Sequence, residues 1–199
     1  MKLEGKSVLN FGTGSVLSFH ATKLFHTIEG GAIVVDCDQL ADKIRALVRF
    51  GQVTINNQSI LGINAKLSEF HAAMGLAVLD EIETIIDRRQ TIYAHYSNEL
   101  KAYFSLQSIS NDVDSNYAYF PMLFNSTSAL LECISCLEDR KIFPRRYFFP
   151  SLERYSTREL INCPYADDIA SRILCLPIYP DLDMEHVKEI CDIVKKFAH

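Results

Sequence analysis

The sequence contains no apolar run of the roughly 18 residues that a helix needs to cross a bilayer; the stretch from Gly30 to Val35 is far shorter. An export signal is not visible either, because Asn10, Gly12 and Gly14 interrupt any apolar stretch near the N-terminus. The net charge is −5, whereas a protein that neutralises a nucleic-acid backbone needs clustered Lys and Arg. We therefore expect a soluble, cytoplasmic protein that binds neither membrane nor nucleic acid.

Cysteine is also scarce. Six cysteines in 199 residues are too few for a disulfide scaffold. Cys133 and Cys136 form a C-x-x-C, but they stand in a segment of helical periodicity, with neither a second such pair nor paired histidines nearby. We expect these two to be ordinary buried thiols, and we expect no metal site.

Glycine and proline occupy opposite parts of the chain. All 8 glycines lie at or before Gly75, and all 6 prolines lie at or after Pro121. Glycine marks tight turns and close backbone approach, whereas proline marks rigid loops and the ends of elements, so two differently built regions are expected. Ser68 as an N-cap, and the helical spacing of apolar residues after it, predict one long joining helix. The predicted domains are residues 1–85 and 86–199.

Shorter elements alternate along the rest of the chain, as is typical of an α/β protein. The predicted strands cover residues 32–35, 117–124 and 141–143, and the predicted helices are one capped by Asp38, one over 129–140, and one over 184–197 capped by Asp183.

The segment SFHATKLFHTIEGGAIV, residues 18–34, is the one that indicates chemistry. Lys23 has apolar neighbours on both sides, and apolar surroundings favour the neutral amine that attacks a carbonyl. Gly30 and Gly31 would let the backbone pass close to a flat ligand, and Ser18 could reach the same ligand if the chain turns. The S-x-x-K spacing of a serine–lysine hydrolase is absent.

Four segments, in order, resemble the DegT/DnrJ/StrS family of pyridoxal-phosphate-dependent nucleotide-sugar aminotransferases. The first holds the family's Schiff-base lysine, the second its Gly-x-Asn-x-Arg/Lys-x-x-Glu pattern, the third an arginine-containing loop, and the fourth a Leu-Pro-x-Tyr-Pro run. They are SFHATKLFHTIEGGAIV, GINAKLSEFHAAMGL (62–76), IFPRRYFFPSL (142–152) and ILCLPIYPDLD (173–183). The resemblance implies an α/β chain that forms the C-terminal portion of fold type I, the aspartate-aminotransferase-like fold, comprising the end of the large domain and the small domain.

The resemblance also implies roles for individual residues. Lys23 would form the imine with pyridoxal 5′-phosphate and later move the substrate proton. Ser18 would donate its hydroxyl to the cofactor phosphate. Asn64 would reach the phosphate of the neighbouring subunit's cofactor, which implies a homodimer; the alternative is a loop residue that bonds its own backbone.

Arg145 or Arg146 would contact an anionic substrate group, either the carboxylate of the amino donor or a sugar-nucleotide phosphate. The sequence does not choose between them, and both could be solvated loop arginines. His20 would touch the cofactor or the sugar, whereas His26 is expected to pack.

A lysine at position 23, where some family members have histidine, implies amino transfer rather than dehydration. The segment HATKLFHTIEGGA is most similar to the same segment in family members that use glutamate to aminate carbon 4 of a dTDP-4-keto-6-deoxy sugar. Such sugars enter cell-surface polysaccharides and O-antigens.

Family members carry a further stretch before this region, which supplies the acid on the pyridine nitrogen, a ring-stacking residue and a phosphate-binding turn. This sequence shows none of them, so we expect apolar faces without cover and weak cofactor retention. Two hypotheses follow. The chain is the C-terminal part of a working sugar aminotransferase, or it is a non-catalytic remnant that acts only as a folding or association module.

Overall fold

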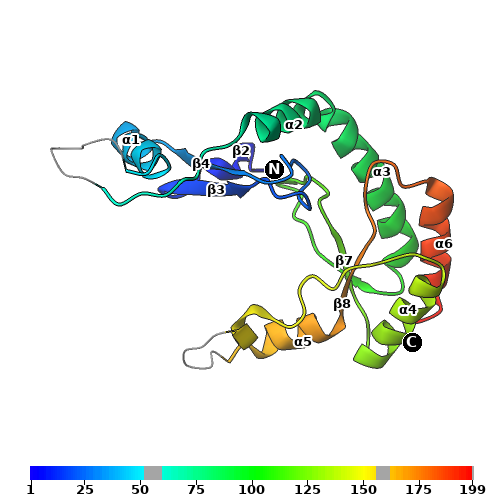
Figure 1. The fold of residues 1–199 in the computed structure, drawn as a ribbon. Helices are drawn as coiled ribbons and strands as arrows, with labels where there is room; N and C mark the ends of the chain where they lie inside the picture. The colour runs from blue at the N-terminus through cyan, green and yellow to red at the C-terminus, as the bar shows by residue number, and fades with distance from the viewer. Residues whose placement is uncertain (52–59, 156–161, 199) are drawn as a thin grey trace. The chain divides into compact units, whose positions relative to one another are not determined.

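Residues 1–51, 60–155 and 162–198 are described by the computed structural model. Their contacts divide into two compact units (Figure 1), which are considered one at a time. Unit 1 comprises Met1–Glu83 with Asn111–Ser115, and unit 2 comprises Thr84–Ser110 with Asn116–His199. Within the described residues, no helix is long and apolar enough to cross a membrane.

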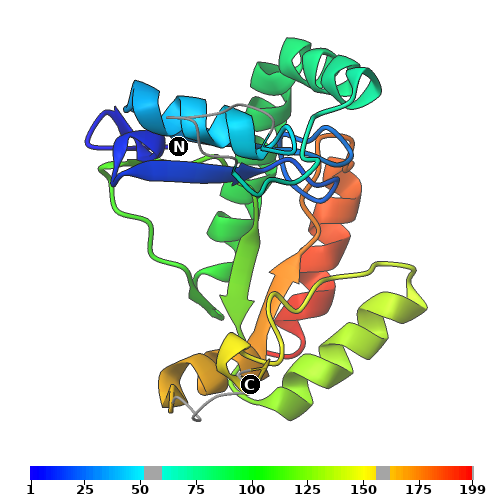
Figure 2. The same ribbon diagram turned by 60° about the vertical axis from the view of Figure 1, so that its left-hand side comes forward.

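Unit 1 is built on a two-stranded antiparallel ribbon of β3 (Gly14–Ser18) and β4 (Gly31–Val35). Helix α1 (Asp38–Leu47) packs against one face of this ribbon (Figure 2). Asp38 is the first helical residue and not the cap predicted for it: the N-cap is Cys37, which makes no side-chain cap. Asp38 instead places its negative charge in the first turn, where the helix dipole favours an acid.

One face of the ribbon exposes apolar side chains. Val16 and Ile33 are register partners there, and they are 80% and 48% exposed. This observation confirms the expectation of uncovered apolar faces. A second small sheet in unit 1 has the order β2 (Lys6–Ser7), β1 (Lys2–Leu3), β6 (Val113–Asp114), and this pairing is what joins the segment Asn111–Ser115 to unit 1.

The predicted long helix is two helices. Helix α2 (Glu69–Asp80) begins after Ser68, whose hydroxyl accepts the backbone N–H of His71 at 3.4 Å, so the predicted N-cap is confirmed. Helix α3 (Ile82–Leu100) follows after Glu81, which has φ −104° and ψ 0° and ends α2. The apolar spacing continues across Glu81, which is why periodicity alone predicts a single helix.

Unit 2 contains most of the buried apolar side chains. Its antiparallel sheet has the order β5 (Ser105–Leu106), β7 (Phe120–Leu123), β8 (Ile173–Leu176). Helices α3, α4 (Thr127–Asp139) and α6 (Met184–Lys195) lie together on one side of it (Figure 1). The largest side chains of this core are Tyr96, Phe120, Phe124, Ile92, Leu100, Met122, Leu130, Leu137, Leu174 and Ile190.

Asp183 caps α6 as predicted, because its carboxylate accepts the N–H of Glu185 at 2.9 Å. The predicted strand at 141–143 is wrong: Lys141 has φ +63° and its N–H bonds the carbonyl of Glu138, so the chain turns at the end of α4. The predicted strand at 117–124 is shorter than expected, since Tyr117 also has a positive φ. The sequence patterns predict neither α5 (Pro164–Arg172) nor β8.

Candidate functional site

The connection between β3 and β4, residues 19–30 and here called the lysine loop, carries Lys23. Its two ends are held together by backbone hydrogen bonds from the N–H of Phe19 to the carbonyl of Gly30 and from the N–H of Thr27 to the carbonyl of Phe19, both at 2.9 Å. Gly30 has φ +155°, and a Cβ there would stand 2.4 Å from the hydroxyl oxygen of Thr27. Only glycine fits this position, so the loop closes tightly at its base.

The inside of the lysine loop is packed. Thr27 is 2% exposed, and its hydroxyl donates to the backbone carbonyl of Glu29 at 2.7 Å. The rings of Phe19 and Phe25 meet edge to face, with their centroids 4.8 Å apart. A Cβ at Gly75 would lie 2.8 Å from the Thr27 methyl group, so helix α2 rests directly on the loop. The loop is therefore a packed element rather than a loose connection.

The side chain of Lys23 is exposed. Its backbone N–H donates to the carbonyl of His20 at 2.9 Å, which makes a turn over residues 20–23. Its neighbours Leu24 and Phe25 are half-buried. Because Lys23 itself is exposed, the expectation that it lies in apolar surroundings is wrong. Within the described residues the Lys23 ammonium group has no hydrogen bond or ion pair, so it is accessible to a ligand.

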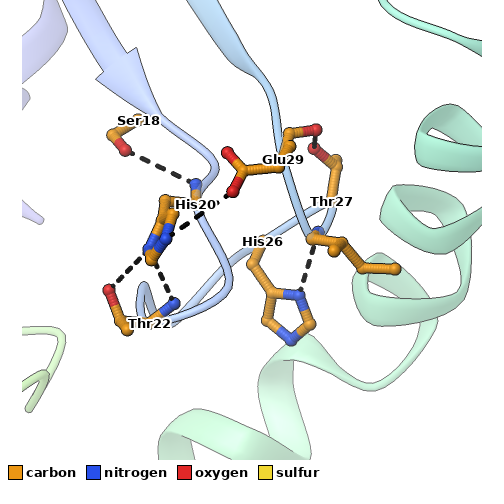
Figure 3. A network of polar contacts seen from close by, with 7 residues as sticks. Ser18, His20, Thr22, His26, Thr27 and Glu29 are labelled. Carbon is orange, nitrogen blue, oxygen red and sulfur yellow. Dashed lines mark hydrogen bonds and ion pairs between the residues drawn. The ribbon is translucent and has the colours of Figure 1, made fainter.

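Ser18 is the last residue of β3, and its side chain is exposed. The hydroxyl oxygen accepts the backbone N–H of His20 at 3.4 Å (Figure 3). Because a hydroxyl both donates and accepts, this bond leaves the Ser18 O–H available to donate to a ligand. Its register partner is Gly31, where a Cβ would lie 2.7 Å from the carbonyl oxygen of Leu17.

His20 contacts residues on both sides of the loop (Figure 3). Its Nδ1 accepts the backbone N–H of Thr22 at 3.3 Å and lies 2.9 Å from the Thr22 hydroxyl. Its Nε2 lies 3.7 Å from a carboxylate oxygen of Glu29. Since Nδ1 accepts an N–H, the proton of the neutral ring belongs on Nε2, facing Glu29. His26 is half-buried, and its Nδ1 accepts the N–H of Ile28 at 3.4 Å.

A groove of about 610 Å³ lies in unit 1 beside the two glycines. It runs between the ribbon, α1 and the segment before α2, and its walls are mostly apolar. Ser18 and Lys23 are not among its lining residues, which are Val16, Leu17, Glu29, Gly30, Gly31, Ala32, Ile33, Ile44, Val48, Ala65, Lys66, Leu67, Ser68 and His71. Asn64 is exposed near this segment and pairs through its backbone with Arg49.

The two candidate arginines belong to unit 2 and differ in their contacts. Arg146 donates through Nη2 to the carbonyls of Ala170 and Ser171, at 3.2 and 3.0 Å, and its guanidinium lies 3.8 Å from the ring centre of Phe149. Burial lowers the pKa of this guanidinium. Arg145 pairs through its backbone with Cys175, while its side chain is exposed. Arg146 therefore holds the end of α5, and Arg145 is the one accessible to a ligand.

The structure thus places His20 and Lys23 in the lysine loop, with Ser18 directly before it, and adds two residues that sequence reasoning missed, Thr27 and Glu29. The signal that could have found Glu29 is its position directly before the paired glycines. Among the residues that the structure describes, no group of three or more His, Cys, Asp or Glu could hold a metal ion.

Comparison with known proteins agrees with this architecture. The family model of the DegT/DnrJ/EryC1/StrS aminotransferases matches residues 1–195. The dTDP-4-amino-4,6-dideoxy-D-glucose transaminase of Shigella dysenteriae is 36% identical over 198 residues, which are 96% of this chain and 54% of that protein. The chain spans about half the length of the curated relatives it matches.

Solved structures have the same fold. DesI, crystallised in the presence of its TDP-sugar product, matches 99% of this chain and 52% of its own with a TM-score of 0.90 and 29% identity. Spr1654 from Streptococcus pneumoniae, in its PLP form, covers 98% of this chain and 54% of its own with a TM-score of 0.88; at 20% identity it shows the fold alone. The predicted α/β architecture of fold type I is confirmed.

Proposed function

This chain belongs to the DegT/DnrJ/EryC1/StrS aminotransferase family, and on that basis we propose that it serves amino transfer from glutamate to a nucleotide-linked 4-keto-6-deoxy sugar, with pyridoxal 5′-phosphate as cofactor. The observation that carries the proposal is that the amine of Lys23 in the lysine loop and the hydroxyl of Ser18, at the end of β3 directly before the loop, are both exposed. The dTDP sugar is inferred from the relative in Shigella dysenteriae and from the TDP-sugar product of DesI. The reaction would take place in the cytoplasm and supply cell-surface polysaccharide.

Ser18 and Lys23 fit the two groups by which the cofactor would be held, its phosphate and its aldehyde. The Ser18 O–H is available to donate to a phosphate oxygen, and the Lys23 amine is accessible for a covalent bond to an aldehyde carbon. Because Gly31 has no Cβ, the start of strand β4 can lie close to the backbone of β3 beside Ser18. When bound, pyridoxal phosphate supplies the electron sink that stabilises the charge left by loss of a proton from carbon. Lys23, once its amine is released, would hold and move that proton.

The remaining candidates are assigned by their accessibility. Arg145 would bind an anionic substrate group, because its side chain is exposed, whereas Nη2 of Arg146 already donates to two carbonyls and its guanidinium lies against the Phe149 ring. Asn64 would donate its amide to the phosphate held by a second copy of the chain, which makes the active form a homodimer. We assign residues 1–85 to the large domain and residues 86–199 to the small domain.

One observation favours the second hypothesis, a non-catalytic association module. Unit 2 encloses an apolar core within its own residues, whereas Lys23 in unit 1 is exposed. In such a chain, the core of unit 2 would stabilise the fold, and Lys23 would be an ordinary surface lysine.

The deciding experiment is covalent trapping with pyridoxal phosphate. The 199-residue chain is mixed with limiting pyridoxal phosphate, reduced with borohydride and mapped by peptide mass spectrometry. We expect the label on Lys23 in preference to Lys66, an exposed lysine of the same unit, and we expect Lys23→Ala to lose it while Lys66→Ala keeps it. Equal labelling of both lysines would support the association module instead.

Turnover is tested on the same chain with glutamate and a dTDP-4-keto-6-deoxy sugar, with the amino sugar detected by mass spectrometry. Because the amine of Lys23 is exposed, we expect the cofactor to be retained weakly before reduction and lost on gel filtration. An amino-sugar product that disappears in Lys23→Ala would establish catalysis by this chain.

A further inference from the structure

We propose that His20 and Glu29 are positioning residues, which set the turn that carries Lys23. The proposal rests on the proposed function for the role of Lys23, but the contacts that carry it belong to the loop itself. Figure 3 shows His20 between Thr22 on its own side of the loop and Glu29 on the returning side. Neither residue needs to touch a substrate to act in this way.

His20 accepts two backbone N–H groups of the turn. Its carbonyl oxygen accepts the N–H of Lys23 at 2.9 Å, and its Nδ1 accepts the N–H of Thr22 at 3.3 Å. This pair of bonds is the arrangement by which Asn and Asp side chains organise turns, with the side chain of one residue bonding the backbone two residues further on. The ring of His20 therefore substitutes for an Asx side chain.

Glu29 orients the ring from the other side. Its carboxylate lies 3.7 Å from Nε2, and its backbone is fixed because its carbonyl accepts the hydroxyl of buried Thr27 at 2.7 Å. A negative charge facing Nε2 favours the tautomer with its proton there. That tautomer leaves Nδ1 unprotonated, as the bond from Thr22 requires.

These residues therefore have two different roles. Ser18 and Lys23 are exposed, and within the described residues the Lys23 ammonium group has no bond, whereas the His20 ring bonds the backbone of Thr22 and faces Glu29. His20 also connects these contacts to Ser18, because the backbone N–H of His20 donates to the Ser18 hydroxyl oxygen at 3.4 Å. A change at His20 or Glu29 would therefore shift the geometry of the Lys23 amine relative to Ser18.

The test is amide hydrogen exchange of Thr22 and Lys23, measured by NMR on the whole chain without cofactor. We expect His20→Ala to speed exchange at both amides by about two- to fivefold, as loss of one exposed hydrogen bond predicts. His20→Asn should restore protection, because Asn accepts the N–H two residues on. Glu29→Ala should speed exchange less, and Glu29→Gln should stay close to the wild-type rate, since its amide oxygen can still face Nε2.

His26→Asn is the matched control, because His26 lies in the same loop but bonds only the N–H of Ile28. It should leave the amides of Thr22 and Lys23 unchanged. Two results would overturn the proposal: His20→Asn exchanging as fast as His20→Ala, or ring ¹⁵N shifts of His20 that show no change of tautomer preference in Glu29→Ala.

A second readout separates this proposal from the proposed function. Borohydride trapping at Lys23 should slow in His20→Ala and recover in His20→Asn; a residue that transfers protons or binds sugar would not be rescued by Asn. If pyridoxal phosphate never labels Lys23 in the wild type, the proposed function fails, and the exchange rates still decide whether His20 and Glu29 set the turn.

Discussion

Gly75 of helix α2 lies directly against Thr27 of the lysine loop. A Cβ at position 75 would stand 2.8 Å from the Thr27 methyl group, and Thr27 cannot move aside easily because it is buried and its hydroxyl is bonded to Glu29. Glycine within a helix costs about 1 kcal/mol relative to alanine. The close approach of helix and loop therefore explains why α2 contains a glycine.

Gly75→Ala should destabilise unit 1 by about 1 kcal/mol, since overpacking costs ~1–3 kcal/mol and the better helix propensity returns ~1 kcal/mol. The free energy of unfolding from denaturant titration measures this. In a Thr27→Ser background, where the contacting methyl group is absent, the same substitution should be neutral or stabilising. Equal effects in both backgrounds would show that the contact does not determine the choice of glycine.

Arg146→Ala should destabilise unit 2 by about 1–2 kcal/mol, because the charge-assisted bonds to Ala170 and Ser171 and the packing on Phe149 are lost. Arg145→Ala should leave stability within about 0.5 kcal/mol and reduce binding of one anionic substrate, either glutamate or the nucleotide sugar. Thermal unfolding and ligand titration measure the two effects. The reverse pattern, with Arg146→Ala stable and deficient in binding, would exchange the roles assigned to these arginines.

The six cysteines should differ sharply in thiol labelling. Burial raises the pKa of Cys133 and Cys191 to about 12 and that of Cys175 to about 11, so none of them offers thiolate at pH 8. Cys37 is exposed and should react first with a maleimide, and Cys37→Ser should remove that fast phase. Mass spectrometry of partly labelled chain gives the order. Early labelling of Cys133 would mean that the core of unit 2 is not closed.

Unit 2 should lose stability in acid through Asp167. The Arg154 guanidinium and the Ser151 hydroxyl bond its carboxylate and hold the pKa of Asp167 below its usual range. A lowered pKa in the folded state gives stability that is present above the unfolded value of about 3.9 and is lost as pH falls through the folded value. Melting temperatures between about pH 5 and pH 2 should therefore fall more steeply for the wild type than for Asp167→Asn. Parallel curves would contradict this prediction.

Features set by neighbours in the chain were predictable from the sequence. The caps at Ser68 and Asp183 depend only on a side chain and the two or three backbone groups that follow it. The chain turns between Ser18 and Lys23, at the bond from the Lys23 N–H to the His20 carbonyl, and the family is identifiable from four ordered segments. The expected domain limits and the roles of the site residues stay predictions.

Features set by distant residues were not predictable. Apolar neighbours in sequence suggest apolar surroundings for Lys23, but Leu24 and Phe25 are half-buried while the lysine is exposed. The difference between Arg145 and Arg146 arises from the position of the end of α5, which no local pattern reveals. The sequence does not predict the end of α2 at Glu81, because no proline or glycine stands there.

The β3–β4 ribbon has a practical consequence for anyone who handles this chain. Within the described residues each of its strands pairs on one side only, and one face carries the exposed side chains of Val16 and Ile33. An unpaired strand edge beside an apolar surface recruits strands from other molecules. We therefore expect concentrated samples to form fibrils or precipitate, and we expect charged substitutions on that face to keep the chain dispersed.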